Sequence, residues 1–241
     1  MSKVQEPMVA FDPHSTGRTR PATVAGVCYL AVIAGGLFAE GMVRQSLIVP
    51  GEPATTASAI FENETLWRFG LAVHLLYLIP ALTFKVIITD FLRRVEPVVA
   101  RLALVFGVAA VTVEAMALVY LYVPLGLIEE GGEILAALED AQALTYLSTR
   151  LFAIGFGFSL LLFAGFCVLV GVLIFRSRLV PRTIGAMMVV AGIGYVVNTL
   201  ALIVSPAFFE LINPSILLPI LLAELSLALW LLLKGIAVEA D

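Results

Sequence analysis

The segment Thr65–Leu92 reads TLWRFGLAVHLLYLIPALTFKVIITDFL, and it indicates the class of fold to expect for the whole chain. It is long and apolar enough to cross a lipid bilayer, which requires about 20 such residues. The ionisable residues Arg68, His74, Lys85 and Asp90 nevertheless lie within it. Because charge inside a bilayer is costly, each of them needs a partner, water or a short route to the interface.

Two residues of this segment suggest more than a plain membrane span. His74 is the only histidine in any apolar segment of the chain, and it lies about 14 Å from the outer end of its helix at about 1.5 Å per residue. Pro80 removes a backbone donor, so it frees the carbonyl group of Leu76 and is expected to bend the helix there. Lys85 and Asp90 are close enough to the opposite end for their charges to reach the membrane surface.

The composition of the chain supports an integral membrane protein. Of its 241 residues, 61% are hydrophobic and only 13% are charged, whereas a soluble domain averages about 25% charged residues. Long apolar runs predict an all-α bundle rather than a membrane β-barrel, whose strands alternate over short segments. The net charge of -4 and the absence of a basic stripe argue against a nucleic-acid partner.

Six apolar segments predict a bundle of six transmembrane helices, at residues 21–44, 65–92, 98–123, 148–175, 183–204 and 215–233. Residues 1–20 are expected to form a disordered cytoplasmic tail, and residues 236–241 a second cytoplasmic tail. A short helix is expected in the first outer loop, over residues 54–64. An acidic, partly amphipathic segment over residues 124–147 precedes the fourth span.

The distribution of lysine and arginine predicts the orientation in the membrane. Ten of the 14 basic residues fall on one side of the predicted spans and three on the other, while Lys85 lies inside a span. Because basic residues concentrate on the cytoplasmic side, both termini are expected in the cytoplasm and the protein in the cytoplasmic (inner) membrane.

Three stretches carry a resemblance to a known family: PGEPATTASAIFENETLWRFG (50–70), FRSRLVPRTIGAMMVVAGIGYVVN (175–198) and LLAELSLALWLLLKG (221–235). In this order and spacing they resemble the domain-of-unknown-function 4386 family of bacterial membrane proteins, from about Ala22 to Gly235. The resemblance implies a multi-pass membrane protein without a defined activity. It also implies that the family's motif positions here are Arg68, Pro181, Arg182, Gly185, Glu224, Trp230, Lys234 and Gly235.

Polar side chains inside the spans gather within roughly 15 Å of the outer ends of their helices. We interpret them as two layers of a polar pocket. The deeper layer is a predicted ligand-binding site formed by His74, Glu114, Asn198 and Glu224. The shallower layer is a vestibule of mainly structural ion pairs formed by Glu40, Arg44, Arg68 and Arg150, in which Glu40 and Arg44 are one helical turn apart.

These residues leave several functions open. The pocket favours a protein that binds or transports a small ligand, an ion or a lipid, because intramembrane ionisable groups are candidate functional groups. An intramembrane enzyme acting on a lipid-like substrate is an alternative, with Glu114 or Glu224 as general acid or base. A structural or interaction subunit is another, and glycine-rich fourth and fifth spans would suit a homo-oligomer.

No catalytic residue can be assigned from the sequence. One histidine and two carboxylates form a possible metal-ligand set at His74, Glu114 and Glu224, but they lie on three separate helices and nothing fixes their spacing. No phosphate-binding loop or nucleophile elbow is present, so no cofactor is expected. Membrane lipid is the one partner that the composition implies directly.

Overall fold

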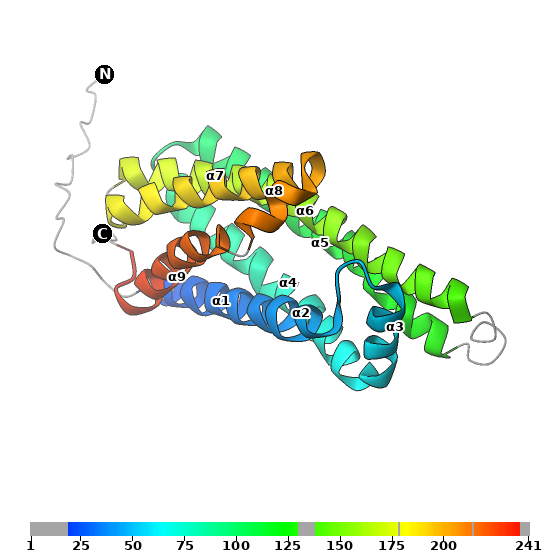
Figure 1. The fold of residues 1–241 in the computed structure, drawn as a ribbon. Coiled ribbons are helices and arrows are strands. Elements are labelled where there is room, and N and C mark those ends of the chain that lie inside the picture. Colours follow the sequence, from blue (N-terminus) through cyan, green and yellow to red (C-terminus); the bar gives the residue numbers. More distant parts are fainter. Residues whose placement is uncertain (1–18, 130–137, 178, 214, 237–241) are drawn as a thin grey trace, which may run out of the picture.

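The computed structural model describes residues 19–129, 138–177, 179–213 and 215–236, and every regular element in these ranges is a helix (Figure 1). The elements are α1 (Arg20–Gly36), the π-helix η1 (Leu37–Arg44), α2 (Gln45–Leu47), α3 (Pro53–Glu62), α4 (Glu64–Leu92), α5 (Pro97–Glu129), α6 (Leu138–Ser177), α7 (Arg182–Val204), α8 (Pro206–Ile212) and α9 (Leu217–Leu233). The predicted all-α fold is therefore confirmed for the described residues.

Five helical segments of the described chain are long and apolar enough to cross a membrane: Arg20–Leu47, Glu64–Leu92, Pro97–Glu129, Asp140–Ser177 and Arg182–Val204. The sixth predicted span corresponds to α9, which is apolar but only 17 residues long. Large apolar side chains cover the outer face of the bundle, and among them Ile79 is 66% exposed and Met116 is 67% exposed. An apolar exterior around buried polar groups suits a bilayer as solvent. The chain is thus a multi-pass membrane protein.

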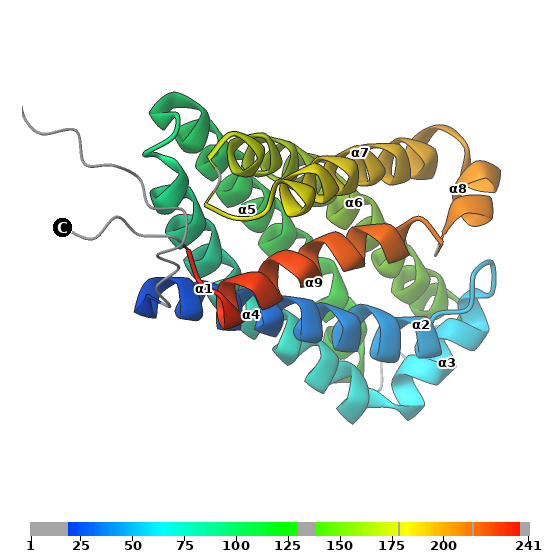
Figure 2. The ribbon, with the colours of Figure 1, turned by 90° about the vertical axis from the view of Figure 1, so that its left-hand side faces the viewer.

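The helices form one bundle in which α1 packs on α4 and α9, α5 packs on α4 and α6, and α7 packs on α6 and α9 (Figures 1 and 2). The first turn of α1 and the last turn of α9 lie at the same end of the bundle in both views. We call this the terminal end. Helix α3 covers the opposite end, where it packs on α6, and we call that the α3 end.

Glycines allow close approach of neighbouring helices within the chain. A Cβ atom on Gly26 of α1 would lie 2.6 Å from the backbone nitrogen of Leu232 in α9. A Cβ atom on Gly171 of α6 would lie equally close, at 2.6 Å, to the carbonyl oxygen of Gly185 in α7. The glycines of α6 and α7 therefore serve contacts between helices of a single copy.

Two helices extend beyond the predicted spans. α5 continues past Pro124 to Glu129 and α6 begins at Leu138, whereas the sequence predicts an end at residue 123 and a start at residue 148. A proline inside a membrane helix is tolerated when neighbouring groups bond the backbone. Here the indole Nε1–H of Trp67 donates to the Leu121 carbonyl at 2.9 Å, which is adjacent to the Tyr120 carbonyl that Pro124 leaves without its helical donor.

Several predictions fall on residues that the structure does not describe. Residues 1–18 and 237–241 hold most of the two predicted tails, and residues 130–137 hold the middle of the predicted acidic segment.

Pro80, at which the sequence predicts a bend, lies inside α4, and the helix continues through it from Glu64 to Leu92.

Candidate functional site

His74 of α4 lies at the centre of a buried polar cluster, with its side chain only 1% exposed. Its Nε2 atom is 3.0 Å from the Glu114 carboxylate of α5. Its Nδ1 atom is 3.4 Å from the Glu40 carboxylate of η1. The two ring nitrogens of one imidazole therefore face carboxylates from two other helical segments.

Tyr77, one turn after His74 on α4, closes this cluster. Its hydroxyl group donates to Glu114 and lies 2.6 Å from Nε2 of His74. Space for the phenol ring comes from Gly35 of α1, where a Cβ atom would lie 2.9 Å from the Tyr77 ring. Phenol, imidazole and carboxylate thus share the protons between them at hydrogen-bond distances.

A proton is missing from this arrangement when the imidazole is neutral. Neutral imidazole has one N–H donor and one lone pair, yet each nitrogen of His74 faces a carboxylate oxygen. One carboxylate must then face a lone pair unless the imidazole or a carboxyl group binds an additional proton. The geometry of Glu40, His74 and Glu114 therefore suits the reversible binding of one proton.

The π-helix η1 brings Glu40 and Arg44 to this cluster. Its eight residues, Leu37–Arg44, interrupt the α-helical geometry between α1 and α2. π-Helical segments are rare and occur frequently at functional sites. The ion pair between Glu40 and Arg44 that their spacing predicts is present. Since Glu40 also faces His74, the predicted division into a deep and a shallow layer does not hold for these two residues.

Arg44 is held among aromatic rings rather than in an open vestibule. The guanidinium carbon lies 3.8 Å from the ring centroid of Phe152 on α6, a cation–π distance. Among the described residues, its Nη1 atom has no hydrogen-bond partner, and the same is true of Nδ1 of His74 and Oε1 of Glu40. The cluster therefore has unused hydrogen-bonding capacity on three adjoining side chains.

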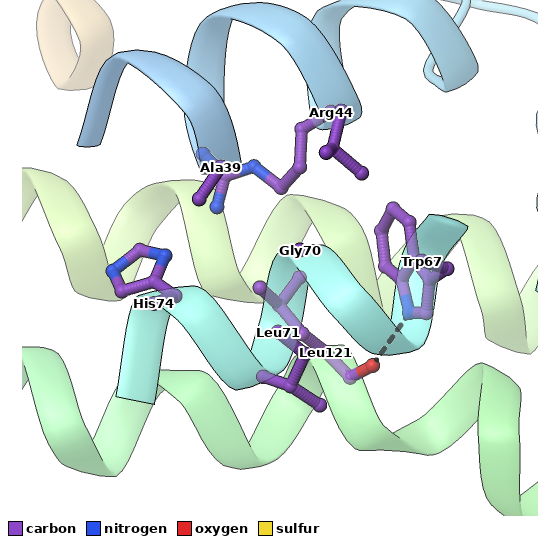
Figure 3. Close-up of a pocket in the computed structure, with 8 residues that line it drawn as sticks. Ala39, Arg44, Trp67, Gly70, Leu71, His74 and Leu121 are labelled. Carbon is purple, nitrogen blue, oxygen red and sulfur yellow. Dashed lines mark hydrogen bonds between the residues drawn. The ribbon is translucent and has the colours of Figure 1, made fainter. Parts of the chain in front are cut away.

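A small cavity lies beside these atoms, between η1 and α4 (Figure 3). The lining residues are Ala39, Val43, Arg44, Trp67, Gly70, Leu71, His74 and Leu121. Figure 3 shows Arg44 extending from η1 toward His74, with Trp67 at the other side of the space. The cavity has room for about one water molecule. A water there would face the unpaired atoms of Arg44 and His74.

Glu224 belongs to a second buried cluster. Its carboxylate on α9 accepts a hydrogen bond of 2.9 Å from the Tyr195 hydroxyl of α7. Tyr29 of α1 also interacts with Glu224, and both phenols are at most 8% exposed. Within the described part of the chain, Glu224 forms no hydrogen bond or ion pair with His74 or Glu114. Of these three predicted residues, the structure therefore brings only His74 and Glu114 together.

Lys85 lies in the interior, which differs from the expectation that it reaches the membrane surface. Lys85 is only 5% exposed. Its Nζ atom lies 4.8 Å from the ring centroid of Phe163 and 5.5 Å from that of Phe166. Side chains of a helix tilt toward its N-terminus. Lys85 is near the C-terminus of α4, so this tilt directs it into the bundle and away from the nearer surface.

The remaining predicted site residues form no hydrogen bond, ion pair or ring contact with His74 in the described part of the chain. Arg68 is a partly exposed residue that pairs with Glu64 at 2.6 Å and with Glu129 at 2.7 Å. Arg150 is exposed and forms no ion pair with the described residues. Asn198 is buried on α7, and its Oδ1 atom has no hydrogen-bond partner in the described part of the chain.

The geometry gives no support to a metal centre or a serine nucleophile. The residues that the structure describes contain no group of three or more His, Cys, Asp or Glu placed to hold a metal ion. The hydroxyl groups of Ser148 and Ser226 donate to backbone carbonyls one turn earlier, at 2.8 Å and 2.7 Å. They are bonded as membrane serines usually are.

The fold and the buried clusters define a polytopic α-helical membrane protein with ionisable groups enclosed between its helices. The chain belongs to the family described as domain of unknown function (DUF4386), whose model matches residues 24–235. This confirms the family resemblance over nearly the whole chain. No curated protein and no solved structure matches the sequence.

The motif positions implied by the family resemblance have mostly structural surroundings. Pro181 precedes the first turn of α7, and Gly185 packs against Gly171 of α6. Gly235 follows the end of α9 with a φ of 76°, a conformation that favours glycine. Glu224 differs from these, because it is a carboxylate buried among the helices.

Proposed function

We propose that this protein binds and releases a proton at the buried cluster of Glu40, Arg44, His74, Tyr77 and Glu114. The observation that carries the proposal is the placement of one imidazole between two carboxylates, 3.4 Å from Glu40 and 3.0 Å from Glu114. Neutral imidazole cannot donate to both, and one additional proton would allow both ring nitrogens to donate.

The charges inside the bundle support the same conclusion. In the described part of the chain, three largely enclosed carboxylates (Glu40, Glu114 and Glu224) accompany two enclosed cations (Arg44 and Lys85). This leaves one negative charge without a counterpart in a medium that disfavours charge. Binding of one proton makes the enclosed set neutral.

The size of the cavity supports a proton rather than an organic ligand. The space beside Arg44 and His74 has room for about one water molecule, whereas sites for organic molecules are typically about 300–1,000 Å³. Trp67, Gly70 and Leu71 line the cavity and precede His74 on α4, so they lie toward the α3 end. Water from the α3 end is therefore the proton source that the geometry favours.

Orientation in the membrane forms part of the proposal. Basic residues concentrate toward the terminal end, which the positive-inside rule assigns to the cytoplasm. The α3 end then faces outward, in the cytoplasmic membrane of a cell, and both termini lie inside. The cluster would exchange its proton with the external medium.

The experiment uses the fact that the chain has two histidines, His14 and His74. In a His14→Ala background, ¹⁵N-histidine labelling leaves His74 as the one labelled imidazole. Nuclear magnetic resonance of this protein in lipid nanodiscs, between about pH 4 and pH 10, is expected to show a reversible change of its ring nitrogen shifts. The change should move to a different pH in Glu114→Gln, because the Nε2 partner loses its charge.

A matched control is Glu62→Gln, which removes an exposed carboxylate on α3. It should leave the His74 titration unchanged. Ring nitrogen shifts that stay constant over the whole range would overturn the proposal and favour a purely structural ion-pair cluster.

A further inference from the structure

Two aromatic rings of α6, Phe152 and Phe156, lie against the proposed proton site, and we call them the aromatic wall. Phe152 is 1% exposed, and the guanidinium of Arg44 lies over its ring with the central carbon 3.8 Å from the ring centroid. The centroid of Phe156, one turn later, is 5.9 Å from the same carbon. The two rings stack at 5.6 Å with an interplanar angle of 17°. The aromatic wall therefore faces a permanent cation.

The aromatic wall also contacts the imidazole. The ring centroid of His74 is 5.7 Å from that of Phe152 and 6.0 Å from that of Phe156. The interplanar angles are 81° and 82°, so both contacts are edge-to-face. The permanent cation and the imidazole of the proposed proton site thus share one aromatic surface on α6.

The charged and titratable groups around His74 come from three helical segments of the described chain. They are Glu40 and Arg44 of η1, Tyr77 of α4 and Glu114 of α5. Within the described residues, α1 and α3 place no such group in contact with the imidazole, and α6 contributes the aromatic wall alone. The aromatic wall is therefore a part of the site that acts on its cations without carrying a charge.

Arg44 is close to more than one group that its charge can serve. It pairs with Glu40, and no ion pair joins it to Glu114 in the part of the chain that the structure describes. Its Nη1 atom has no hydrogen-bond partner among these residues, and Figure 3 shows the side chain extending toward His74. A guanidinium has five N–H donors in a planar fork. Stacking on Phe152 fixes the plane of that fork, and with it the carboxylate that the fork reaches.

We propose that Phe152 is a positioning residue of the proton site, which holds Arg44 on Glu40 and leaves Glu114 to the exchangeable proton. This inference rests on the proposed function. A guanidinium free to turn toward His74 and Glu114 would bring a fixed positive charge to the place of the proton, and proton binding would weaken. Phe156 supports Phe152 by stacking on it.

Fluorinated phenylalanine at position 152 tests this role, because it weakens the attraction to a cation while nearly keeping the shape of the ring. Fluorine withdraws electron density from the ring face, so rings with one, two and three fluorine atoms weaken the attraction in steps. ¹⁵N-Histidine in the His14→Ala background reports the pH at which His74 titrates in nanodiscs. Phe158, which is 48% exposed on the same helix, receives the same series as a matched control.

The His74 titration is expected to move to lower pH with each fluorine atom at position 152, by about 1 pH unit over the series. The direction follows because a released guanidinium competes with the proton for Glu114. The series at Phe158 should leave the titration unchanged. In the Glu40→Gln/Arg44→Gln background the series at position 152 should also leave it unchanged, since no guanidinium remains to be positioned.

Two results would overturn the positioning role while the proposed proton site stands. One is a His74 titration that stays constant, or moves to higher pH, over the series at position 152. The other is a shift that persists without Arg44, because the ring would then act on the imidazole directly. A wild-type His74 that does not titrate would instead overturn the proposed function, and this role with it. If the ring with three fluorine atoms prevents folding by circular dichroism, the ring with one fluorine atom decides by the same criteria.

Discussion

The imidazole of His74 and the carboxylate of Glu114 meet at 3.0 Å inside the bundle, although 40 positions of sequence separate them. Glu40 faces the opposite ring nitrogen from a third segment. Three parts of the chain therefore converge on one imidazole, and their charges depend on whether a proton is bound. The proposed proton binding would link the folding of the bundle to pH.

The folded protein is expected to become more stable as the pH falls from about 8 to about 6.5. Exposed glutamates are ionised in this range, and an exposed histidine changes from almost fully neutral at about pH 8 to half protonated at about pH 6.5. With the proposed proton bound, the native cluster therefore holds up to one proton more than the unfolded chain. The free energy of unfolding should then fall by up to about 1.4 kcal/mol for each unit of rising pH. Thermal unfolding in nanodiscs at several pH values measures this slope.

The variant Glu114→Gln tests the origin of the slope. It removes the unpaired negative charge, so stability should become nearly independent of pH over the same range. Glu62→Gln removes an exposed carboxylate and should retain the wild-type slope. Equal slopes in Glu114→Gln and in the wild-type protein would show that another group is responsible.

Arg44 is expected to be essential for the stability of the cluster. Arg44→Gln leaves the Glu40 carboxylate enclosed without its cation, which should cost about 3–5 kcal/mol of unfolding free energy. The double variant Glu40→Gln/Arg44→Gln should recover part of this loss, because no unpaired charge remains. Arg150→Gln, at an exposed position, should change the free energy by less than about 0.5 kcal/mol. If Arg44→Gln and Arg150→Gln lowered the free energy of unfolding by similar amounts, the ion pair between Glu40 and Arg44 would not be important for stability.

Much of the fold can be predicted because long apolar runs have few alternatives in a membrane. A run such as residues 65–92 must satisfy its own backbone hydrogen bonds, so it forms a helix. Helix rise also predicts that His74 and Glu114 lie at similar depths, and the structure brings them into contact. The ends of α5 are harder to predict, because nothing in a hydropathy pattern makes a helix stop where the bilayer stops.

The composition of the site depends on rotations that residue spacing does not reveal. The π-helix at Leu37–Arg44 changes which face of the first span carries Glu40. The inward course of Lys85 depends on the space left by Gly107 on another helix. The hydroxyl of Tyr77 becomes a partner only once α4 and α5 are packed together. The one available signal was that Tyr77 follows His74 by three residues, on the same face.

Two glycines of α1 provide a test of the packing between α1 and α9. At Gly26 a Cβ atom would lie 2.6 Å from the backbone nitrogen of Leu232, and no flexible side chain can move to relieve that contact. Gly26→Ala should therefore destabilise the protein by about 1–3 kcal/mol. Gly36→Ala should be neutral or stabilising by up to about 1 kcal/mol, because nothing lies within 4 Å of its Cβ position. Thermal unfolding that ranks the two variants in the opposite order would contradict this packing.

The proposed orientation predicts opposite labelling of the two ends of the bundle. Glu52 is exposed at the α3 end, and Arg94 is exposed at the terminal end, between α4 and α5. In a background with Cys28→Ala and Cys167→Ala, a membrane-impermeant maleimide should label Glu52→Cys on intact cells. It should label Arg94→Cys only after permeabilisation, because the basic residues of that end are retained in the cytoplasm. Labelling of Arg94→Cys on intact cells would reverse the orientation and would place the proposed proton site in exchange with the cytoplasm.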